Sequence, residues 1–276
     1  MSTSEADETR SDADSKRSDY VGALARGLAV IEAFGRTTPE LTLSEVAQLT
    51  GMSPATARRN LHTLEELGFV KRHNKRFLLA PRVLTLGSAF LQAANVDEAV
   101  MPELRRIVTL FGDAASMATL EGTDILYIAH FSELRAARRT ASVGVTYPAY
   151  ATSMGRILLA GLPPAELAAY WREFRPTKLT DVTVTDRDAL AAIVDEARRV
   201  GYTVAVDQLD YGITSLSVPV KNEAGRVVAA INTSGYSPRL DARTLVEERL
   251  AELQVSAGRI ANLLARYPGL AHSLLR

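Results

Sequence analysis

Residues 42–68 constrain the fold most strongly, because two helical patterns in this stretch are separated by a single tight turn. Gly51 follows the first pattern and suits the left-handed conformation in which many helices end. Ser53 can cap the second helix, and Pro54 fits its first turn because a first-turn N–H has no intrahelical acceptor. The apolar residues of the second helix recur on one face: Ala57, Leu61 and Leu64. This pattern predicts a helix-turn-helix.

The outer side of the second helix carries Arg58 and Arg59, with no acidic residue within four positions of either. On an ordinary solvated helix such arginines only confer solubility. Here they are followed by FVKRHNKRFLL, residues 69–79, which predicts a basic hairpin that turns at His73 and Asn74. The combination favours contacts to DNA phosphates and base edges. The predicted DNA-binding residues are Ser53, Thr56, Arg58, Arg59, Thr63, Lys71, Arg72, Lys75 and Arg76.

Charge is distributed unevenly along the chain. The net charge of the 276 residues is zero, which by itself favours neither a nucleic acid nor a membrane as partner. Residues 1–19 carry six acids and three bases, whereas residues 52–80 carry six bases and two acids. Positive charge is therefore concentrated on the predicted helix-turn-helix and its hairpin, and residues 1–19 are predicted to form a disordered acidic tail.

Another helix is predicted before these elements. Its apolar residues recur at helical spacing: Leu24, Leu28, Ile31 and Phe34. Three helices followed by a basic hairpin predict a winged helix-turn-helix domain over residues 20–80. Residues 81–97 contain more apolar side chains than one small interface needs, so they predict a linker helix with a dimer-forming face.

Residues 98–276 predict an antiparallel sheet with helices around it, which makes the whole chain α+β. The predicted helices lie at 100–111, 154–160, 164–174, 186–200 and 246–267, and the strands within 115–131, 141–147, 202–206, 213–220 and 226–234. Strands that return through hairpins argue against a parallel, doubly wound sheet.

The composition indicates a cellular compartment. The chain has no cysteine, which excludes disulfides, thiolate metal sites and cysteine nucleophiles. The first twenty residues are polar and acidic, and no run approaches 18 apolar residues, so neither a signal peptide nor a membrane span is expected. We expect a soluble, cytoplasmic protein with no membrane partner.

Several stretches resemble the IclR family of bacterial transcriptional regulators. They are LSEVAQLTGMSPATARR (43–59), LEELGFV (64–70), FLLAPRVLTLG (77–87) and YPAYATSMGRILLA (147–160). The resemblance runs from Tyr20 to about Arg266 and is strongest to the subgroup that controls aromatic-acid breakdown through protocatechuate and β-ketoadipate. It implies a GAF-like C-terminal domain that binds a small carboxylate, and a homodimer or dimer of dimers on a roughly palindromic double-stranded DNA operator.

One departure from that subgroup lies just before the SVPV strand. The resemblance implies an arginine there, and this chain has Thr214. If the arginine holds a carboxylate or a domain contact in relatives, the effector of this chain differs from theirs.

The stretch YPAYATSMGR also predicts an anion site from its own chemistry. Pro148 ends a strand and a helix begins soon after, so free first-turn N–H groups lie at the positive end of a helix dipole. The hydroxyls of Thr152 and Ser153 can fix a carboxylate, although simple helix capping is the alternative, and Gly155 allows close approach of a ligand. Polar residues on the later strands are either pocket lining or hydrogen-bonded strand residues. The predicted effector-binding residues are Ala151, Thr152, Ser153, Met154, Gly155, Asp207, Ser215, Ser217 and Asn232.

Two alternatives stay open beside a ligand-responsive, sequence-specific regulator of a catabolic operon. Residues 151–155 read A-x-S-x-G, a variant of the hydrolase nucleophile elbow, with His130 as base and Asp207 as orienting acid. The chain order and antiparallel strands do not match α/β-hydrolases, so we expect no enzyme. The second alternative is a DNA-binding protein without a small-molecule effector. Four scattered histidines and the absence of a phosphate-binding glycine loop predict neither metal nor cofactor.

Overall fold

The chain forms two compact units in the computed structural model. The structure describes residues 20–35, 37–93, 95–133, 141–236 and 240–274, so the predicted acidic tail lies outside the described residues. The first unit ends at Ser88 and the second begins at Ala89.

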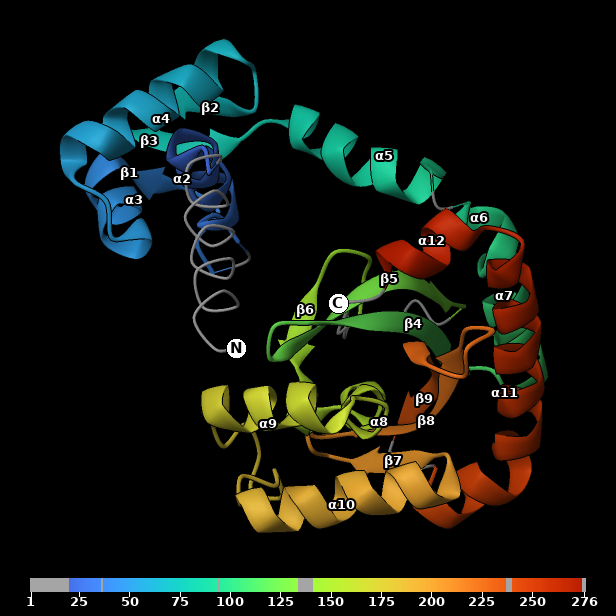
Figure 1. Cartoon of the computed structure of the whole chain (residues 1–276). Coiled ribbons are helices and arrows are strands. Elements are labelled where there is room, and N and C mark those ends of the chain that lie inside the picture. The colour runs from blue at the N-terminus through green and yellow to red at the C-terminus, as the bar shows by residue number, and fades with distance from the viewer. Residues whose placement is uncertain (1–19, 36, 94, 134–140, 237–239, 275–276) are drawn as a thin grey trace, which may run out of the picture. The chain divides into compact units, whose positions relative to one another are not determined.

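The N-terminal unit consists of three helices and a small antiparallel sheet (Figure 1). The helices are α2 (Gly22–Glu32), α3 (Leu43–Thr50) and α4 (Pro54–Glu66). The strands are β1 (Leu41–Thr42), β2 (Val70–His73) and β3 (Arg76–Leu79), in the order β1-β3-β2. The predicted winged helix-turn-helix is confirmed. Strand β1 was not predicted, because two residues are too few to show an alternating pattern.

Local hydrogen bonds fix the turn between α3 and α4. Thr42 and Glu45 form a capping box at the start of α3, in which each side chain accepts from the other residue's backbone N–H. Gly51 ends α3 at φ 65°, a conformation that costs glycine little. The Ser53 hydroxyl then accepts the Thr56 N–H at 3.3 Å and starts α4. The capping box, the left-handed glycine and the serine N-cap all act over a few residues, which explains why the sequence predicted these helix boundaries well.

Helix α2 is covered along only part of its length. On the predicted apolar face Phe34 is buried and Ile31 is half-buried, whereas Leu24 and Leu28 are exposed; Val30, which is not on that face, is fully buried. Helical spacing places residues on one face but does not say how far the neighbouring elements extend over it. The end of α2 packs into the small core, which also contains Leu41, Val46, Ala57, Leu61, Leu64 and Val70.

The predicted linker helix over 81–97 is divided into three pieces. A 3₁₀ turn (Pro81–Val83) leads into α5 (Leu84–Ala93), and α6 (Val96–Ala99) follows after Asn95, whose φ is 46°. A positive φ interrupts a right-handed helix, and asparagine tolerates it better than most residues. No residue of α5 is buried.

The C-terminal unit contains a curled, six-stranded antiparallel sheet in the order β6-β5-β4-β9-β8-β7. Its strands are β4 (Ala114–Glu121), β5 (Asp124–Ser132), β6 (Thr146–Pro148), β7 (Thr203–Val206), β8 (Ile213–Lys221) and β9 (Val227–Tyr236). The first and the last long strands, β4 and β9, pair in the middle of the sheet. This arrangement confirms the predicted α+β class.

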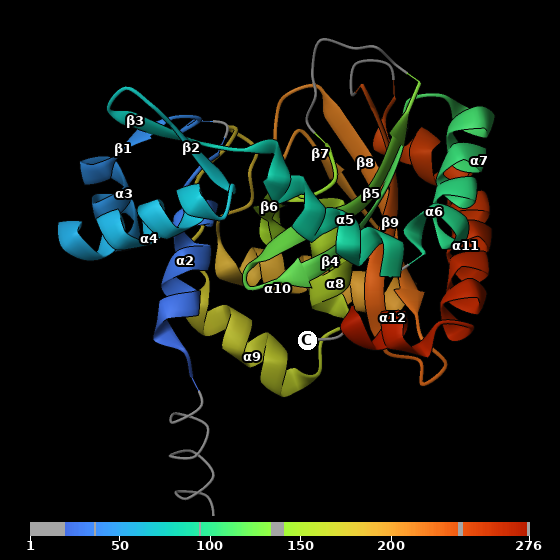
Figure 2. The same ribbon diagram turned by 90° about the horizontal axis from the view of Figure 1, so that it is seen from above.

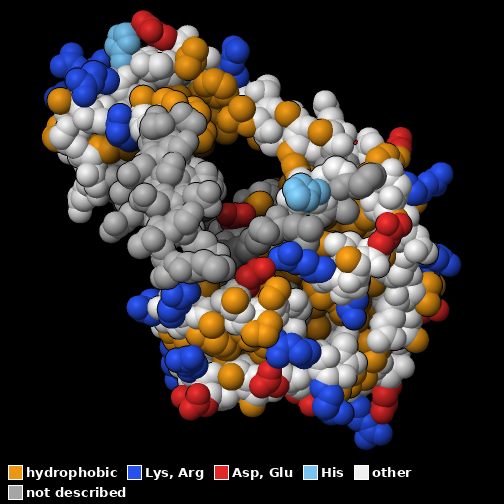
Figure 3. All heavy atoms as spheres, in the orientation of Figure 1, with side chains coloured by type: hydrophobic (Ala, Val, Ile, Leu, Met, Phe, Trp, Pro, Cys, Tyr) orange, Lys and Arg blue, Asp and Glu red, His pale blue; other side chains and the backbone are white. Residues whose placement is uncertain are grey.

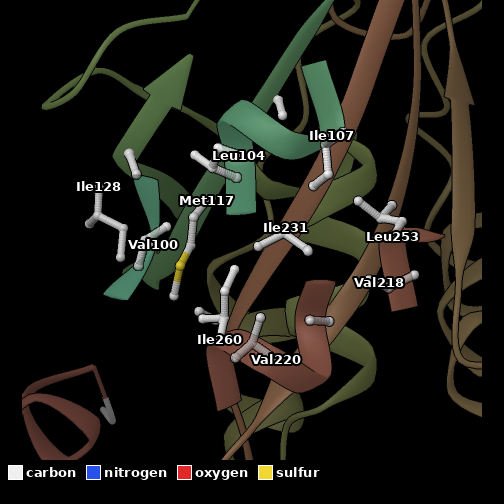
Figure 4. Packing of buried hydrophobic residues seen from close by; sticks show 14 of the residues in the cluster. Val100, Leu104, Ile107, Met117, Ile128, Val218, Val220, Ile231, Leu253 and Ile260 are labelled. Atoms are coloured by element: carbon white, nitrogen blue, oxygen red, sulfur yellow. The ribbon is translucent and has the colours of Figure 1, made fainter. Parts of the chain in front are cut away.

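Helices cover both faces of this sheet (Figure 2). One face packs on α7 (Met101–Phe111) and α11 (Ala242–Ala265), and Figure 4 shows Met117, Ile231 and Val218 meeting helix side chains such as Leu104 and Leu253. The other face packs on α8 (Ser153–Ala160), with α10 (Arg187–Val200) and α9 (Pro164–Glu173) beyond it. The chain ends with α12 (Pro268–Ser273), which was not predicted. Because both faces are buried, each strand presents two different sets of side chains to two helix layers.

Candidate functional site

A cavity of about 40 Å³ lies where α8 begins against the sheet, with room for about three water molecules. Its wall comes from the sheet, from the start of α8 and from the loop after β7. The lining residues are Ser116, Tyr127, Ala141, Ala151, Thr152, Ser153, Met154, Ala205, Gln208, Leu209, Ile213, Ser215, Asn232 and Ser234. None of these side chains is an acid or a base, so the described wall is polar without carrying a formal charge.

Helix α8, which begins at the cavity, is wholly buried in the protein. All eight residues of α8 are buried, and Thr152 caps the helix because its hydroxyl accepts the Gly155 N–H at 3.0 Å. The first-turn N–H groups of Ser153 and Met154 precede the intrahelical ladder. The positive end of the α8 dipole is therefore placed at the wall of the cavity.

Ser153 is held by two other serines. Its hydroxyl lies 2.8 Å from that of Ser215 and 2.7 Å from that of Ser217, both on β8. Each contact joins two buried hydroxyl groups that can exchange donor and acceptor roles. The start of α8 is thereby fastened to the sheet by polar contacts rather than by apolar packing alone.

A row of polar side chains crosses the sheet beneath α8. Ser116 of β4 pairs in register with His130 of β5 and with Asn232 of β9, which in turn pairs with Ser217 of β8. The Ser116 hydroxyl lies 3.0 Å from Nδ1 of His130, and burial lowers the pKa of that histidine. Asn232 is 5% exposed, and its Oδ1 has no hydrogen-bond donor among the described residues. A buried acceptor without a donor is costly, so this amide requires a further partner.

Six of the nine predicted effector residues line the cavity: Ala151, Thr152, Ser153, Met154, Ser215 and Asn232. Ser217 reaches it only through its contact with Ser153. Gly155 lies outside the lining, because it faces Ala149 so closely that a Cβ would be 2.2 Å from that carbonyl oxygen. Asp207 also lies outside, because its carboxylate accepts the Gly212 N–H at 2.7 Å and shapes the loop after β7.

The structure brings in residues that sequence analysis did not select. Ser116 and Ser234 alternate with apolar residues on β4 and β9, so their period-two spacing was the available signal. Tyr127 and Gln208 had no such signal, because β5 carries an irregular register and Gln208 follows β7 in a loop. Thr214, where the resemblance implied an arginine, does not line the cavity, because its neighbour Ser215 on β8 does and adjacent strand residues face opposite ways. Its buried hydroxyl has no partner among the described residues.

Among the described arginines of the C-terminal unit, Arg156 and Arg249 are buried, and their surroundings differ. Arg249 of α11 lies 3.0 Å from the Asp113 carboxylate and donates to the Thr233 hydroxyl at 3.0 Å. Arg156 of α8 is 3% exposed, and it donates to the Tyr150 carbonyl at 2.9 Å and to Oε1 of Gln208 at 2.6 Å. Burial lowers the pKa of Arg156 to about 10, so the guanidinium stays charged at neutral pH.

The residues of the hydrolase alternative do not form a triad. Ser153 contacts Ser215 and Ser217, whereas His130 contacts Ser116. The hydroxyl of Ser153 therefore has two serine neighbours and no base among its hydrogen-bond partners in the described chain. No cluster of three or more histidine and acidic side chains within the described ranges is placed to hold a metal ion.

The predicted DNA-contacting side chains of α4 lie on its exposed face. Lys and Arg side chains gather over α4 in Figure 3, where Arg58 and Arg59 are both exposed. Arg58 forms no ion pair with another described residue, and Arg59 reaches only the Thr56 hydroxyl at 3.4 Å. Ser53 and Thr56 hydrogen-bond each other at 3.0 Å, and Thr63 donates to the Arg59 carbonyl.

The four basic residues of the β2–β3 hairpin are all exposed, but they are not equivalent. Arg72 donates to the Asn74 carbonyl and lies over the Phe77 ring, and Arg76 pairs with Glu45 at 3.6 Å. Lys71 and Lys75 have no acidic partner within the described chain. The hairpin thus keeps at least two uncompensated positive charges.

A winged helix-turn-helix unit joined to a sheet-and-helix unit with a small polar cavity is typical of a transcriptional regulator. Two family profiles match the chain. The IclR helix-turn-helix domain covers residues 23–74, and the bacterial transcriptional regulator IclR C-terminal domain covers residues 88–262. The chain belongs to the IclR family of bacterial transcriptional regulators.

Individual relatives agree with this assignment. The Pca regulon regulatory protein of Pseudomonas putida is 38% identical over 87% of this chain and 83% of its own length. A solved transcriptional regulator from Rhodococcus sp. RHA1 is 40% identical, with a TM-score of 0.76 over 90% of this chain and 100% of its own. An IclR homologue from Microbacterium hydrocarbonoxydans, solved with 4-hydroxybenzoate, shares the fold at 24% identity and a TM-score of 0.70, over 88% of this chain and 99% of its own. The relatives are regulators, and nothing supports the hydrolase alternative. No helix in the described part of the chain is long and apolar enough to cross a bilayer.

Proposed function

We propose that the protein binds an operator through α4 and the β2–β3 hairpin, and that an aromatic acid bound in the cavity beside α8 controls this binding. The observation that carries the proposal is the buried Asn232 carboxamide, whose Oδ1 has no donor in the described cavity. A ligand hydroxyl that donates to this oxygen recovers the free energy lost by burying it. Such a site rejects analogues that lack the hydroxyl.

The other end of the ligand belongs at the start of α8. A carboxylate there accepts from the N–H groups of Ser153 and Met154, and from the Thr152 hydroxyl once it turns from the Ala149 carbonyl, with Ala151 and Ser215 beside it. Three further predicted residues support this wall from outside. Ser217 orients Ser153, and Gly155 allows α8 to begin close to Ala149. Asp207 shapes the loop after β7. The name of the Pseudomonas putida relative and the 4-hydroxybenzoate in the Microbacterium structure favour aromatic acids.

The ligand must change the cavity in order to enter it. A space of about 40 Å³ holds a few waters but not an aromatic ring with its substituents. Binding therefore selects a wider form of the C-terminal unit. A ligand with different affinity for two forms shifts the equilibrium between them, which is the requirement for control of DNA binding.

On the DNA, α4 lies in the major groove. Arg58 and Arg59 contact phosphates or guanine edges, and Ser53, Thr56 and Thr63 help to set the register. The hairpin bases, Lys71, Arg72, Lys75 and Arg76, hold flanking phosphates. The prediction is clearest for Arg58. It forms no ion pair with a described residue, so its replacement removes a DNA contact without breaking an ion pair inside the protein.

We further propose a homodimer or dimer of dimers that acts in the cytoplasm. Helix α5 supports the dimer, because Leu84 is 75% exposed and Leu86 and Phe90 are also exposed on it. Apolar side chains of this kind on one short helix are typical of a surface that another chain covers. Paired helix-turn-helix units bind half-sites about one DNA turn apart.

Fluorescence anisotropy of the purified protein on DNA from upstream of its own gene tests the proposal. Titrations are made with and without protocatechuate, 4-hydroxybenzoate and β-ketoadipate, at several salt concentrations. We expect tight, salt-sensitive binding that protocatechuate or 4-hydroxybenzoate alters, and a response to β-ketoadipate alone would contradict an aromatic effector. Lys75→Ala should weaken binding to all sequences and make the salt slope shallower by about one, whereas Arg58→Ala should also relax base preference. Arg172→Ala, an exposed arginine on α9, is the matched control.

The outcomes separate the alternatives. Equal losses on operator and random DNA for Arg58→Ala would contradict base reading by α4. Tight binding that no acid alters would favour a DNA-binding protein without an aromatic effector. Absence of DNA binding would reject the regulator itself.

A further inference from the structure

Arg249 and Arg156, the buried arginines described above, differ in whether a negative charge lies beside them. Arg249 has the Asp113 carboxylate as counter-ion, whereas no carboxylate of the described chain lies within ion-pairing distance of Arg156. Both hydrogen-bond partners of Arg156 are neutral, a backbone carbonyl and a carboxamide. A buried charge without a counter-ion is costly, and such charges are usually paired.

The carboxamide partner connects this charge to the cavity. Gln208 lines the cavity, and its Oε1 accepts from Arg156 at 2.6 Å and from the Val184 N–H at 3.0 Å. Its Nε2 donates to the Val182 carbonyl at 2.7 Å. All these contacts hold Gln208 in one orientation, so the guanidinium is fixed one side chain behind the cavity wall.

Nothing on the described wall offsets this charge. The lining side chains are neutral, and the positive end of the α8 dipole adds to the same sign of potential. The Oδ1 of Asn232, in a side chain that is 5% exposed and has no donor among the described residues, is a second observation that points to a ligand here. An anion in the cavity would therefore serve as the missing counter-ion of Arg156.

We propose that Arg156 is a specificity-determining residue, whose charge acts from behind Gln208 and makes the cavity prefer a carboxylate over the matching neutral amide. Arg156 does not touch the ligand; it acts through the field in a poorly solvated space, where charges several ångströms apart still interact strongly. This inference rests on the proposed function only in taking the cavity as the ligand site.

The test compares, for each protein, the dissociation constant of an acid with that of the matching neutral amide. Isothermal titration gives dissociation constants for acid and amide pairs: 4-hydroxybenzoate with 4-hydroxybenzamide, benzoate with benzamide, and acetate with acetamide. The proteins are the wild type, Arg156→Gln, Arg156→Lys and the exposed control Arg172→Gln. We expect the wild type to prefer the acid by about tenfold or more. Arg156→Gln should remove most of this preference, while Arg156→Lys and Arg172→Gln keep it.

Several results would overturn the proposal. Equal weakening of acid and amide in Arg156→Gln would assign Arg156 a purely structural role, and equal affinity of the wild type for acid and amide would leave no preference to explain. If Arg156→Gln does not fold, Arg156→Met decides, because it is a second variant that removes the charge; loss of the acid preference there supports the proposal and retention contradicts it. If acetate is preferred over acetamide but no aromatic acid binds, the role of Arg156 stands and the aromatic effector is rejected. If no carboxylate binds, the role of Arg156 is rejected, and the DNA titrations judge the regulator separately.

Discussion

Replacing Gly155 with alanine tests whether α8 begins in direct contact with the Ala149–Ala151 turn. A Cβ at Gly155 would lie 2.2 Å from the Ala149 carbonyl oxygen and 2.4 Å from its Cα. Both distances fall about 1 Å or more short of the usual separation of non-bonded heavy atoms. Because both contacts are backbone atoms, no side-chain rotation relieves them. Overpacking a filled interior costs about 1–3 kcal/mol, and backbone displacement adds to this, so Gly155→Ala should lower the free energy of unfolding by about 3 kcal/mol.

The matched control is Gly258→Ala, in the middle of α11. A Cβ there meets nothing within 4 Å, so alanine should stabilise the helix by about 0.5–1 kcal/mol. Urea unfolding is followed by the fluorescence of Trp171, the only tryptophan, because it lies on α9 and reports the C-terminal unit. A Gly155→Ala midpoint equal to that of the wild type, at an unchanged denaturant slope, would refute the close packing.

Three further substitutions test other contacts. Thr42→Ala removes the capping box of α3 and should cost about 1 kcal/mol, seen as faster hydrogen exchange of α3 amides; unchanged exchange would contradict the cap's role. Arg249→Leu leaves the Asp113 carboxylate unpaired and should cost about 3–5 kcal/mol by Trp171 fluorescence, whereas a loss below about 1 kcal/mol would show that the ion pair is dispensable. Burial lowers the pKa of His130 below its ordinary 6.5, so as the pH falls through 6.5 the unfolded chain binds a proton that the folded chain resists. Unfolding free energy should therefore decline from pH 7 to 5 by at most about 1.4 kcal/mol per pH unit, and His130→Gln should flatten this decline; an unchanged slope in the variant would assign it to other groups.

Much of the fold could be predicted because local signals and tertiary structure agree. The boundaries of α3 and α4 follow from Gly51 and Ser53, whose backbone and side-chain preferences act over a few residues. The broken linker could not be predicted in the same way, since asparagine also occurs inside helices and no neighbouring residue type signals its positive φ. The exposure of Leu24 and Leu28 could not be predicted either. Helical spacing shows which residues share a face, but it does not show whether another element packs on that face.

The cavity was only partly predictable for a similar reason. The start of α8 was found because hydroxyl residues and a glycine follow a strand end, which is a local pattern. The polar row across the sheet depends on strand order and register, which bring together Ser116 and Asn232 from opposite ends of the unit. Arg156 escaped notice because a sequence does not show that an arginine lacks a carboxylate. Only the packing reveals its neutral partners.

The pairing of β4 with β9 at the centre of the sheet has a consequence for how the protein is made. Residues up to Ser88 form a separate compact unit, whereas the cavity needs Asn232 and Ser234 near the far end of the chain. At about 5–20 residues per second, a ribosome takes roughly 7–30 s to extend the chain from one point to the other. During that interval each nascent chain carries the whole helix-turn-helix unit before the cavity of the C-terminal unit exists.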